Sequence, residues 1–303
     1  MIAALILAAG VVPEDSKRKL TDYIGGASSI RRLILVFRQA GIRKIVVVTG
    51  YDAEAVENHC SRMGVVFLRN EAYETEDKLS SVKIGLNYLK NKCARAFMAP
   101  THVPFFSAET VKALESAEGQ VVIPCYNKKA GHPILISESI FDHILTYNGD
   151  GGLKSALSQE GTAYRFIDVD DKGVLADTRK RANVSGLIKN QSLKKIRPEA
   201  KIQLISERGF FGPGTLLLLN LTREFGSLKQ AAIQMGMSYS KAIKMITVTE
   251  EQLGYKVLES RQGGVGGGSS IITKNGLDLM RRYEAFESEC TKFVNEAFKK
   301  HFT

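Results

Sequence analysis

The chain has 303 residues, 44% of them hydrophobic, so it is long enough for two domains that each bury a core of their own. Its net charge of +10 favours acidic partners, such as phosphates, nucleotides or nucleic acid. The four cysteines are far apart and form no CxxC pair, which argues against a zinc site and against a disulfide framework. Cysteine usage therefore predicts a cytoplasmic protein.

The first twelve residues, "MIAALILAAGVV", are apolar. They lack a basic start and an AxA cleavage site, and they are too few to span a bilayer, so we expect a buried strand. No other apolar run approaches the roughly 20 residues that a membrane helix needs. The sequence therefore predicts no membrane association.

From residue 1 to about residue 180, short β-branched runs alternate with amphipathic helical stretches. Runs such as "KIVVVTG" and "RAFMAP" are continuously apolar, and stretches such as "SIRRLILVFRQAG" separate them. This alternation is typical of βαβ units, whose strands are buried on both faces. We predict that residues 1–186 form an α/β domain with a doubly wound, mostly parallel sheet.

The periodicity breaks after this region, where "ANVSGLIKNQSLKKIRPEAK" is polar and basic. We predict a linker at 187–197 and a second, smaller domain at 198–303. From residue 187 onward, 18 Lys and Arg stand against 11 Asp and Glu, so this part carries most of the net charge. An acidic partner is therefore expected mainly for the second domain.

The second domain shows a helix-turn-helix pattern. A first helix is predicted for "PGTLLLLNLTREFGS", with Pro213 in its first turn and Gly226 at its end. The short stretch "SLKQAAIQMGMS" and a second helix in "SYSKAIKMITVTEEQLGY", opened by Ser238 or Ser240, follow it. Helices joined by "GMS" indicate helix-turn-helix. A strand, a glycine loop, a strand and a long amphipathic helix complete the chain.

The glycine loop "GGVGGGS" invites two interpretations. A phosphate-binding loop is the weaker one, because no Lys-Ser/Thr follows and a strand comes next instead of a helix. A wing of a winged helix explains it better, because missing side chains let the backbone approach DNA. The candidate DNA contacts here are Arg261, Gly263, Gly264, Gly266, Gly267, Gly268 and Lys274.

The segment from "FGPGTLLLLNLTREFGSLKQAAIQMGMSYSKAIKMI" through "GGVGGGSSIITKNGLDLMRRYEAF" resembles the DNA-binding domain of molybdate-responsive transcriptional regulators, a LysR-like winged helix. The resemblance implies that the helix after "GMSY" enters the major groove of duplex DNA and that the last helix, near 277–298, makes a homodimer. The residues it implicates in DNA binding are Ser238, Tyr239, Ser240, Lys241 and Lys244. The alternative is that these polar residues form a solvated helix face. The family's molybdate-binding module is missing, so that ligand is not carried over.

The first domain resembles the nucleotidyltransferases of molybdenum cofactor maturation, which attach CMP or GMP to molybdopterin. The likeness runs through "AALILAAG", "NEAYETEDKLSSVKIGL", "APTHVPFFSAETV", "AGHPILIS" and "NGDGGLKSAL". Ligands of this fold class lie at the carboxyl ends of the strands. The nucleotide-binding residues that the resemblance implies are Ala8, Ala9, Gly10, Lys19, Ser80 and Ser81.

Three departures from that family fall where catalysis is expected. The family loop LAAGxSxRMGxxK has become "LAAGVVPEDSKRK", which adds two carboxylates. The family's PxDxP, whose aspartate holds Mg²⁺, has become "PTHVP" with His102 in that position, and imidazole is a poor ligand for a hard cation. DIDTPED has become "LADTRKRAN", which keeps only Asp177. The catalytic candidates are therefore Lys19, His102 and Asp177, and no metal site is assigned.

Several alternatives stay open for this domain. In one alternative, His102 caps the next helix or pairs with a backbone carbonyl. In another, it binds a softer metal together with His132. In a third, the cations "RKR" at 179–181 replace the charge of the metal and bind an anion without turnover. The first hypothesis is thus a DNA-binding regulator that senses a small anionic ligand, a nucleotide or a molybdopterin-like pterin. The second is an active transferase using Mg²⁺ and CTP or GTP, and the third is a docking scaffold.

Overall fold

The computed structural model describes residues 1–10, 20–24, 26–61, 63–158, 161–180, 187, 198, 200–261 and 269–302, with side chains at 260 and 261 left aside. Two compact units make up the chain, Met1–Lys194 and Lys195–Thr303. Lys19, Arg181 and the loop glycines Gly263, Gly264, Gly266, Gly267 and Gly268 lie outside the described residues. Within the described parts, no helix has the length and apolar character needed to cross a membrane.

Unit 1 is built on a mixed, mainly parallel sheet with the strand order β10-β7-β9-β6-β1-β4-β5. Strand β1 pairs in parallel with β4 and β6, β4 with β5, and β10 with β7. The strand bounds are β1 Ile2–Ala8, β4 Lys44–Thr49, β5 Val66–Arg69, β6 Arg95–Pro100, β7 Val121–Tyr126, β9 Ile134–Ser137 and β10 Tyr164–Asp168. The predicted α/β class and the dominance of parallel pairing are confirmed.

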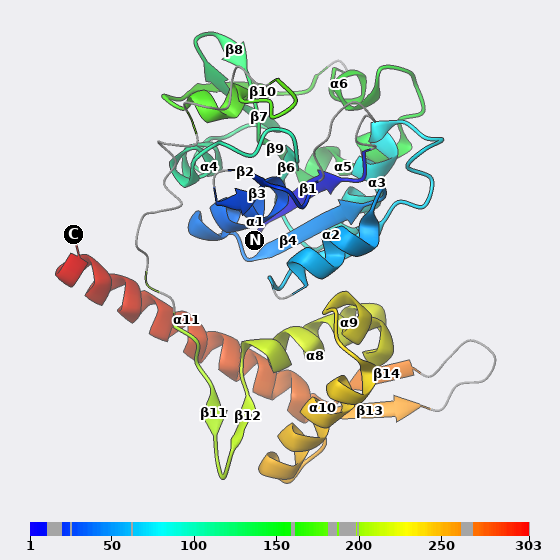
Figure 1. Cartoon of the computed structure of the whole chain (residues 1–303), viewed down its shortest axis with the longest axis vertical. Coiled ribbons are helices and arrows are strands. Elements are labelled where there is room, and N and C mark those ends of the chain that lie inside the picture. The colour runs from blue at the N-terminus through cyan, green and yellow to red at the C-terminus, as the bar shows by residue number, and fades with distance from the viewer. Residues whose placement is uncertain are drawn as a thin grey trace. The chain divides into compact units, whose positions relative to one another are not determined.

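Helices cover both faces of this sheet (Figure 1). Successive residues of β1 point to opposite faces of the sheet. Ala4 and Ile6 join the core that α1, α2 and α4 complete, whereas Leu5 faces Gly85 of α3 on the other face. A Cβ at Gly85 would overlap the Leu5 side chain, so the glycine lets α3 pack closely. The bounds are α1 Ser29–Gln39, α2 Ala53–Cys60, α3 Lys78–Leu89, α4 Ala108–Glu115, α5 Phe141–Thr146 and α6 Gly152–Leu157.

One strand runs against the others. Strand β9 is antiparallel to both β6 and β7, so the sheet reverses direction next to its central strands. The alternation of apolar runs does not predict this strand, because it follows β7 after a short connection and no intervening helix. Short elements complete the unit: β2 Tyr23–Ile24, β3 Ala27–Ser28, β8 Lys129–Ala130, η1 Glu138–Ile140 and η2 Lys172–Leu175.

Unit 2 contains three consecutive helices, two hairpins and a long final helix (Figure 1). Helix α8 starts with Pro213 in its first turn and ends at Gly226 in the left-handed conformation, as the sequence predicts. Ser238 is the N-cap of α10, where its hydroxyl accepts from the backbone N–H of Lys241. The bounds are β11 Leu204–Ile205, β12 Gly209–Phe211, α8 Pro213–Phe225, α9 Leu228–Gln234, α10 Tyr239–Leu253, β13 Leu258–Arg261, β14 Ser269–Ile272 and α11 Lys274–Phe302.

The hairpin of β13 and β14 is tied to the three helices by polar contacts. One Glu250 carboxylate oxygen accepts from the N–H groups of Val257 and Leu258, at 3.0 and 3.1 Å. The N–H of Ser270 donates to the Gly226 carbonyl at 2.8 Å. These bonds fix the hairpin against the end of α10 and against the turn between α8 and α9.

Candidate functional site

The carboxyl ends of β1, β4 and β6 meet at one edge of the sheet, as parallel strands require. Just beyond β1, the carbonyl of Ala9 accepts from the Tyr51 N–H at 3.3 Å. Ala8 and Ala9 are buried, whereas Gly10 is exposed. A ligand at this edge would therefore meet the backbone near Gly10 and not the alanine side chains.

The two predicted serines lie in the first turn of α3 and share one partner. The buried side-chain amide of Asn70 donates to the hydroxyls of Ser80 and Ser81, both at 2.9 Å. Asp77, the N-cap of α3, accepts from the N–H of Ser80 at 3.3 Å. Ser81 is itself buried, so its hydroxyl serves the packing of this turn, and Ser80 is the more accessible of the pair.

Asn70 is a site residue that the sequence analysis missed. It follows β5, and its side-chain oxygen accepts from the Ala72 N–H at 3.0 Å while its amide holds the serines. Sequence reasoning considered the serine pair without the residue that positions it. A polar residue directly after an apolar strand run is the signal that could have found it.

His102 lies just beyond β6 and is packed under the loop that carries Asp177. Its carbonyl accepts from the N–H of Thr178 at 2.8 Å, which brings that loop to the end of the strand. Two glycines allow this approach: a Cβ at Gly173 would collide with the Phe105 carbonyl, and one at Gly131 would collide with the Val174 carbonyl.

His102 does not cap the following helix, which corrects one of the expected roles. The N-cap of α4 is Ser107, whose hydroxyl accepts from the Thr110 N–H at 3.1 Å. Asp171 secures the same turn, because its carboxylate accepts from the Ser107 N–H at 2.7 Å and from the Thr110 hydroxyl at 2.6 Å. The turn before α4 is therefore secured without His102.

The imidazole of His102 is held in its neutral form. Burial and, to a smaller extent, the charge of Arg179 lower the pKa of His102 to about 4, although the Asp177 carboxylate acts in the opposite direction. Lys78, at the start of α3, acts in the same direction as Arg179. At neutral pH the position therefore carries no charge, where the resembled family has a carboxylate.

Asp177 and Arg179 form a bidentate ion pair. The Arg179 guanidinium donates to the two carboxylate oxygens at 2.9 and 2.6 Å. Burial raises the pKa of Asp177, but the hydrogen bonds from Arg179 outweigh burial and hold this pKa below its ordinary value. The expectation that the cations at 179–181 replace the charge of a metal needs correction for Arg179, because Asp177 already engages that charge.

A second histidine, His132, lies close enough to His102 to influence its titration. Burial lowers the pKa of His132 to about 4, and its Nδ1 atom is buried without a hydrogen-bond partner. Within the described residues, no group of three or more His, Cys, Asp or Glu side chains is arranged to hold a metal ion. In the part of the chain that the structure describes, His102 and His132 therefore have no third ligand of the kind that a zinc or manganese site needs.

In unit 2, the predicted contact residues share one exposed side of α10. Ser240, Lys241 and Lys244 are exposed and Tyr239 is 47% exposed, whereas Ala242 and Ile246 on the opposite side are buried. The first acidic residue of the helix is Glu250, so its first eleven residues present only neutral and positive groups. Lys274 is exposed at the start of α11, and Arg261 ends β13.

Helix α11 changes character along its length. Near its start, Met280 and Tyr283 are buried against the unit, but farther along Phe293 is 71% exposed and Phe302 is 67% exposed. A shallow groove lined by Phe286, Cys290, Phe293 and Val294, among others, follows this second half. Large apolar side chains in such a row are unfavourable to leave in water.

Residues 4–163 match the family model of the MobA-like NTP transferase domain. The chain belongs to this family. The match runs from within β1 to the residue before β10, and it includes the ends of β1, β4 and β6, the serine pair, His102 and His132. None of the curated protein sequences matches the chain at a significant level.

Solved structures share this fold at low sequence identity. A nucleotidyl transferase from Methanothermobacter thermautotrophicus is 20% identical over 63% of this chain and 98% of its own, with a TM-score of 0.54. A 4-diphosphocytidyl-2C-methyl-D-erythritol synthase from Anaerococcus prevotii is 13% identical over 62% of this chain and 97% of its own, with a TM-score of 0.50. The Mycobacterium tuberculosis protein Rv0371c, solved in complex with manganese, is 20% identical over 55% of this chain and 88% of its own, with a TM-score of 0.46.

Proposed function

We propose that the protein is a DNA-binding transcriptional regulator whose MobA-like NTP transferase domain binds a nucleotide, a pterin or a related anionic ligand instead of catalysing nucleotidyl transfer. Unit 2 is the DNA-binding part, a winged helix with α10 as its recognition helix. Unit 1 is the sensor. The observation that carries the proposal is His102, a neutral imidazole at the strand end where the resembled transferases hold Mg²⁺ with a carboxylate.

The loss of that carboxylate bears directly on catalysis. Metal-assisted phosphoryl transfer depends on the ion for several kcal/mol of charge stabilisation, and about 1.4 kcal/mol corresponds to a tenfold change in rate. A site without the ion should be slower by three or more orders of magnitude. The charge of Lys78, which acts on His102, and the exposed backbone at Gly10 still suit an anionic ligand.

The exposed side of α10 supports DNA binding. It offers Lys241 and Lys244 without any acidic residue in the first eleven positions of the helix, and Ser240 and Tyr239 can contact bases or phosphates. In the proposed winged helix, the turn before α10 and the β13–β14 hairpin would be the turn and the wing. A merely solvated face would more often mix both signs of charge.

The second half of α11 supports a homodimer. Phe293 and Phe302 are largely exposed along an apolar row, and a second copy of the same helix would cover them. Dimeric winged helices read two half-sites of duplex DNA. Association through α11 would therefore give the protein the symmetry that a palindromic site requires.

An active molybdopterin cytidylyl- or guanylyltransferase with a fused DNA-binding domain is the second candidate. The observation in its favour is the family match over residues 4–163, which includes the strand ends, the serine pair and His102. In that case Mg²⁺ and CTP or GTP would be needed, and His102 would have to be replaced as a ligand by another group.

Two assays separate these candidates. In fluorescence anisotropy with a labelled mixed-sequence duplex, the wild type should bind, and Lys241→Ala with Lys244→Ala should flatten the salt dependence, by about 0.9 in log-log slope for each phosphate that a lysine neutralises. Incubation with CTP or GTP, Mg²⁺ and molybdopterin should release no pyrophosphate. Metal-dependent release that needs molybdopterin, from a protein that binds no duplex, would overturn the regulator in favour of the enzyme.

A further inference from the structure

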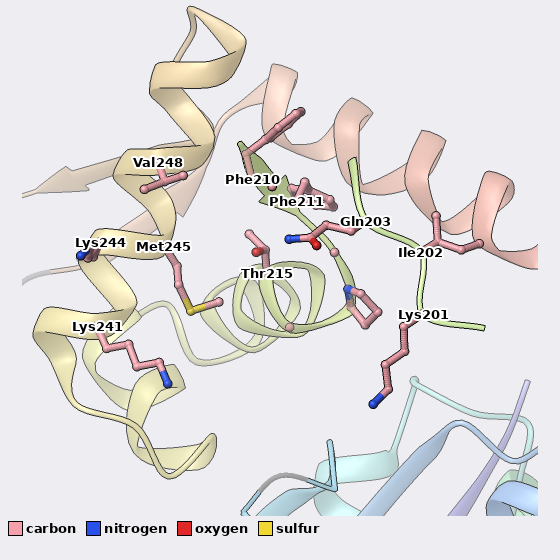
Figure 2. A pocket seen from close by; sticks show the side chains of 14 residues that line it. Lys201, Ile202, Gln203, Phe210, Phe211, Thr215, Lys241, Lys244, Met245 and Val248 are labelled. Carbon is pink, nitrogen blue, oxygen red and sulfur yellow. The ribbon is translucent and has the colours of Figure 1, made fainter. Parts of the chain in front are cut away.

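A groove of about 550 Å³ crosses unit 2 beside the exposed side of α10. In Figure 2, Lys241 on α10 and Lys201 lie on opposite sides of this groove, and Met245 points from α10 toward the start of α8. Its walls come from the segment before β11, the connection from β12 into α8, and α10. The groove thus joins parts of the unit that are distant in sequence.

The groove is positively charged, and no carboxylate is among the described residues that line it. Three lysines line it, Lys201, Lys241 and Lys244, and all three are exposed. Among the described residues, no ion pair engages any of them. The carboxylates at the other end of α10 are occupied: Glu251 pairs with Arg208 at 2.5 Å and Glu250 pairs with Lys256 at 2.6 Å. The three lysines are therefore available to an anion.

The walls of the groove are held by specific contacts. The Thr249 hydroxyl donates to the Phe210 carbonyl at 2.8 Å, which fixes β12 to α10. The Tyr283 hydroxyl donates to the Ile202 carbonyl at 2.6 Å, which fixes the segment beside Lys201 to α11. Phe211 packs edge-on against the Tyr283 ring, with centroids 5.1 Å apart. The lysines thus stand on a preformed surface, which lowers the entropy that binding costs.

We infer that this groove seats backbone phosphates of the same duplex that α10 contacts, so that the DNA interface extends to the segment at 201–203 and the start of α8. The inference rests on the proposed DNA-binding function. DNA is the occupant because Lys241 and Lys244 belong to both surfaces, so a duplex lying on α10 continues over the groove. Charge complementarity favours a polyanion, since cations line both sides.

The first test replaces the lysine that belongs to the groove alone. Lys201→Ala in the full chain should weaken binding of a fluorescein-labelled mixed-sequence duplex about eightfold at roughly 0.1 M salt, and should reduce the log-log salt slope by about 0.9. Lys112→Ala is the matched control, because Lys112 is an exposed lysine on α4 of unit 1 and its removal changes the net charge equally. That control should keep the wild-type slope.

The second test places a carboxylate in the groove without disturbing the fold. Gly214 is exposed in the first turn of α8, and a Cβ there would meet only the Met245 methyl, at 3.9 Å. Gly214→Asp should not lower the melting temperature, because acidic residues are favourable in the first turn of a helix. It should nevertheless weaken duplex binding about tenfold relative to Gly214→Ala, which carries the added Cβ without the charge.

The outcomes distinguish this inference from the function on which it rests. If Lys241→Ala weakens binding but Lys201→Ala and Gly214→Asp match their comparison variants, the DNA-binding function stands and the groove is no part of the interface. If the wild type binds no duplex, both fail. If inorganic phosphate or CTP binds the groove and leaves duplex binding unchanged, the groove is a separate anion site and the inference is overturned.

Discussion

Acid should destabilise unit 1 through His132, an imidazole that the fold keeps neutral. Burial lowers the pKa of His132 to about 4, against about 6.5 in an unfolded chain. Between these two values the unfolded state binds a proton that the folded state does not, so stability falls as the pH falls. The contribution is fully present above pH 6.5 and is lost by about pH 4.

The size of this effect follows from the two pKa values. A difference of about 2.5 units at about 1.4 kcal/mol per unit gives at most about 3 kcal/mol from His132 alone. His102 titrates in the same direction, but its partial exposure to solvent reduces its share. A decrease of about 3 kcal/mol is a substantial fraction of the stability of a typical domain.

The measurement compares the wild type with His132→Asn by urea unfolding between pH 7 and pH 4. Hydrogen exchange of peptides from β9 assigns the free energy of unfolding to unit 1. His301→Asn, at an exposed position in unit 2, controls for the removal of a histidine. The variant should lose less stability on acidification than the wild type does. Parallel destabilisation of the two proteins would refute the argument that buried His132 drives the acid sensitivity.

Three further predictions test other parts of the molecule. Phe293→Asp should convert a dimer to a monomer in sedimentation at micromolar concentration, whereas Asn295→Asp, an equal charge change at an exposed position, should not; a monomeric wild type would contradict the dimer. His102→Asp should raise Mg²⁺ affinity in isothermal titration calorimetry, and His102→Asn should not; equal affinities would remove this position from the metal question. Gly173→Ala should lower the melting temperature by several degrees, because its Cβ would collide with the Phe105 carbonyl; an unchanged value would show that the loop can shift.

The elements of unit 2 could be predicted because local chemistry sets their bounds. Pro213 in the first turn of α8 and Gly226 at its left-handed end act within a few residues of the chain. Ser238 caps α10 in the same local way. Helix ends of this kind depend on neighbouring residues, which a sequence displays directly.

The reversal at β9 could not be predicted in this way. Its direction depends on pairing with β6, about forty residues earlier in the chain, and nothing in "ILIS" distinguishes a parallel from an antiparallel strand. The bidentate pairing of Asp177 with Arg179 is a second example, because two residues at this spacing meet only when the loop bends back. Both features depend on tertiary contacts, which local patterns do not encode.

The electrostatics of the strand ends connect the fold to the proposed sensor. A neutral imidazole in place of a carboxylate makes the site more positive by one charge, and Lys78 lies near enough to influence it. A magnesium nucleotide has part of its charge neutralised by the ion, whereas a metal-free nucleotide presents its full negative charge. The exchange at His102 thus weakens the site for the metal complex and strengthens it for the bare anion. For that reason we expect unit 1 to bind an anionic ligand without catalysing its turnover. We expect the response to that ligand to depend on DNA binding by unit 2.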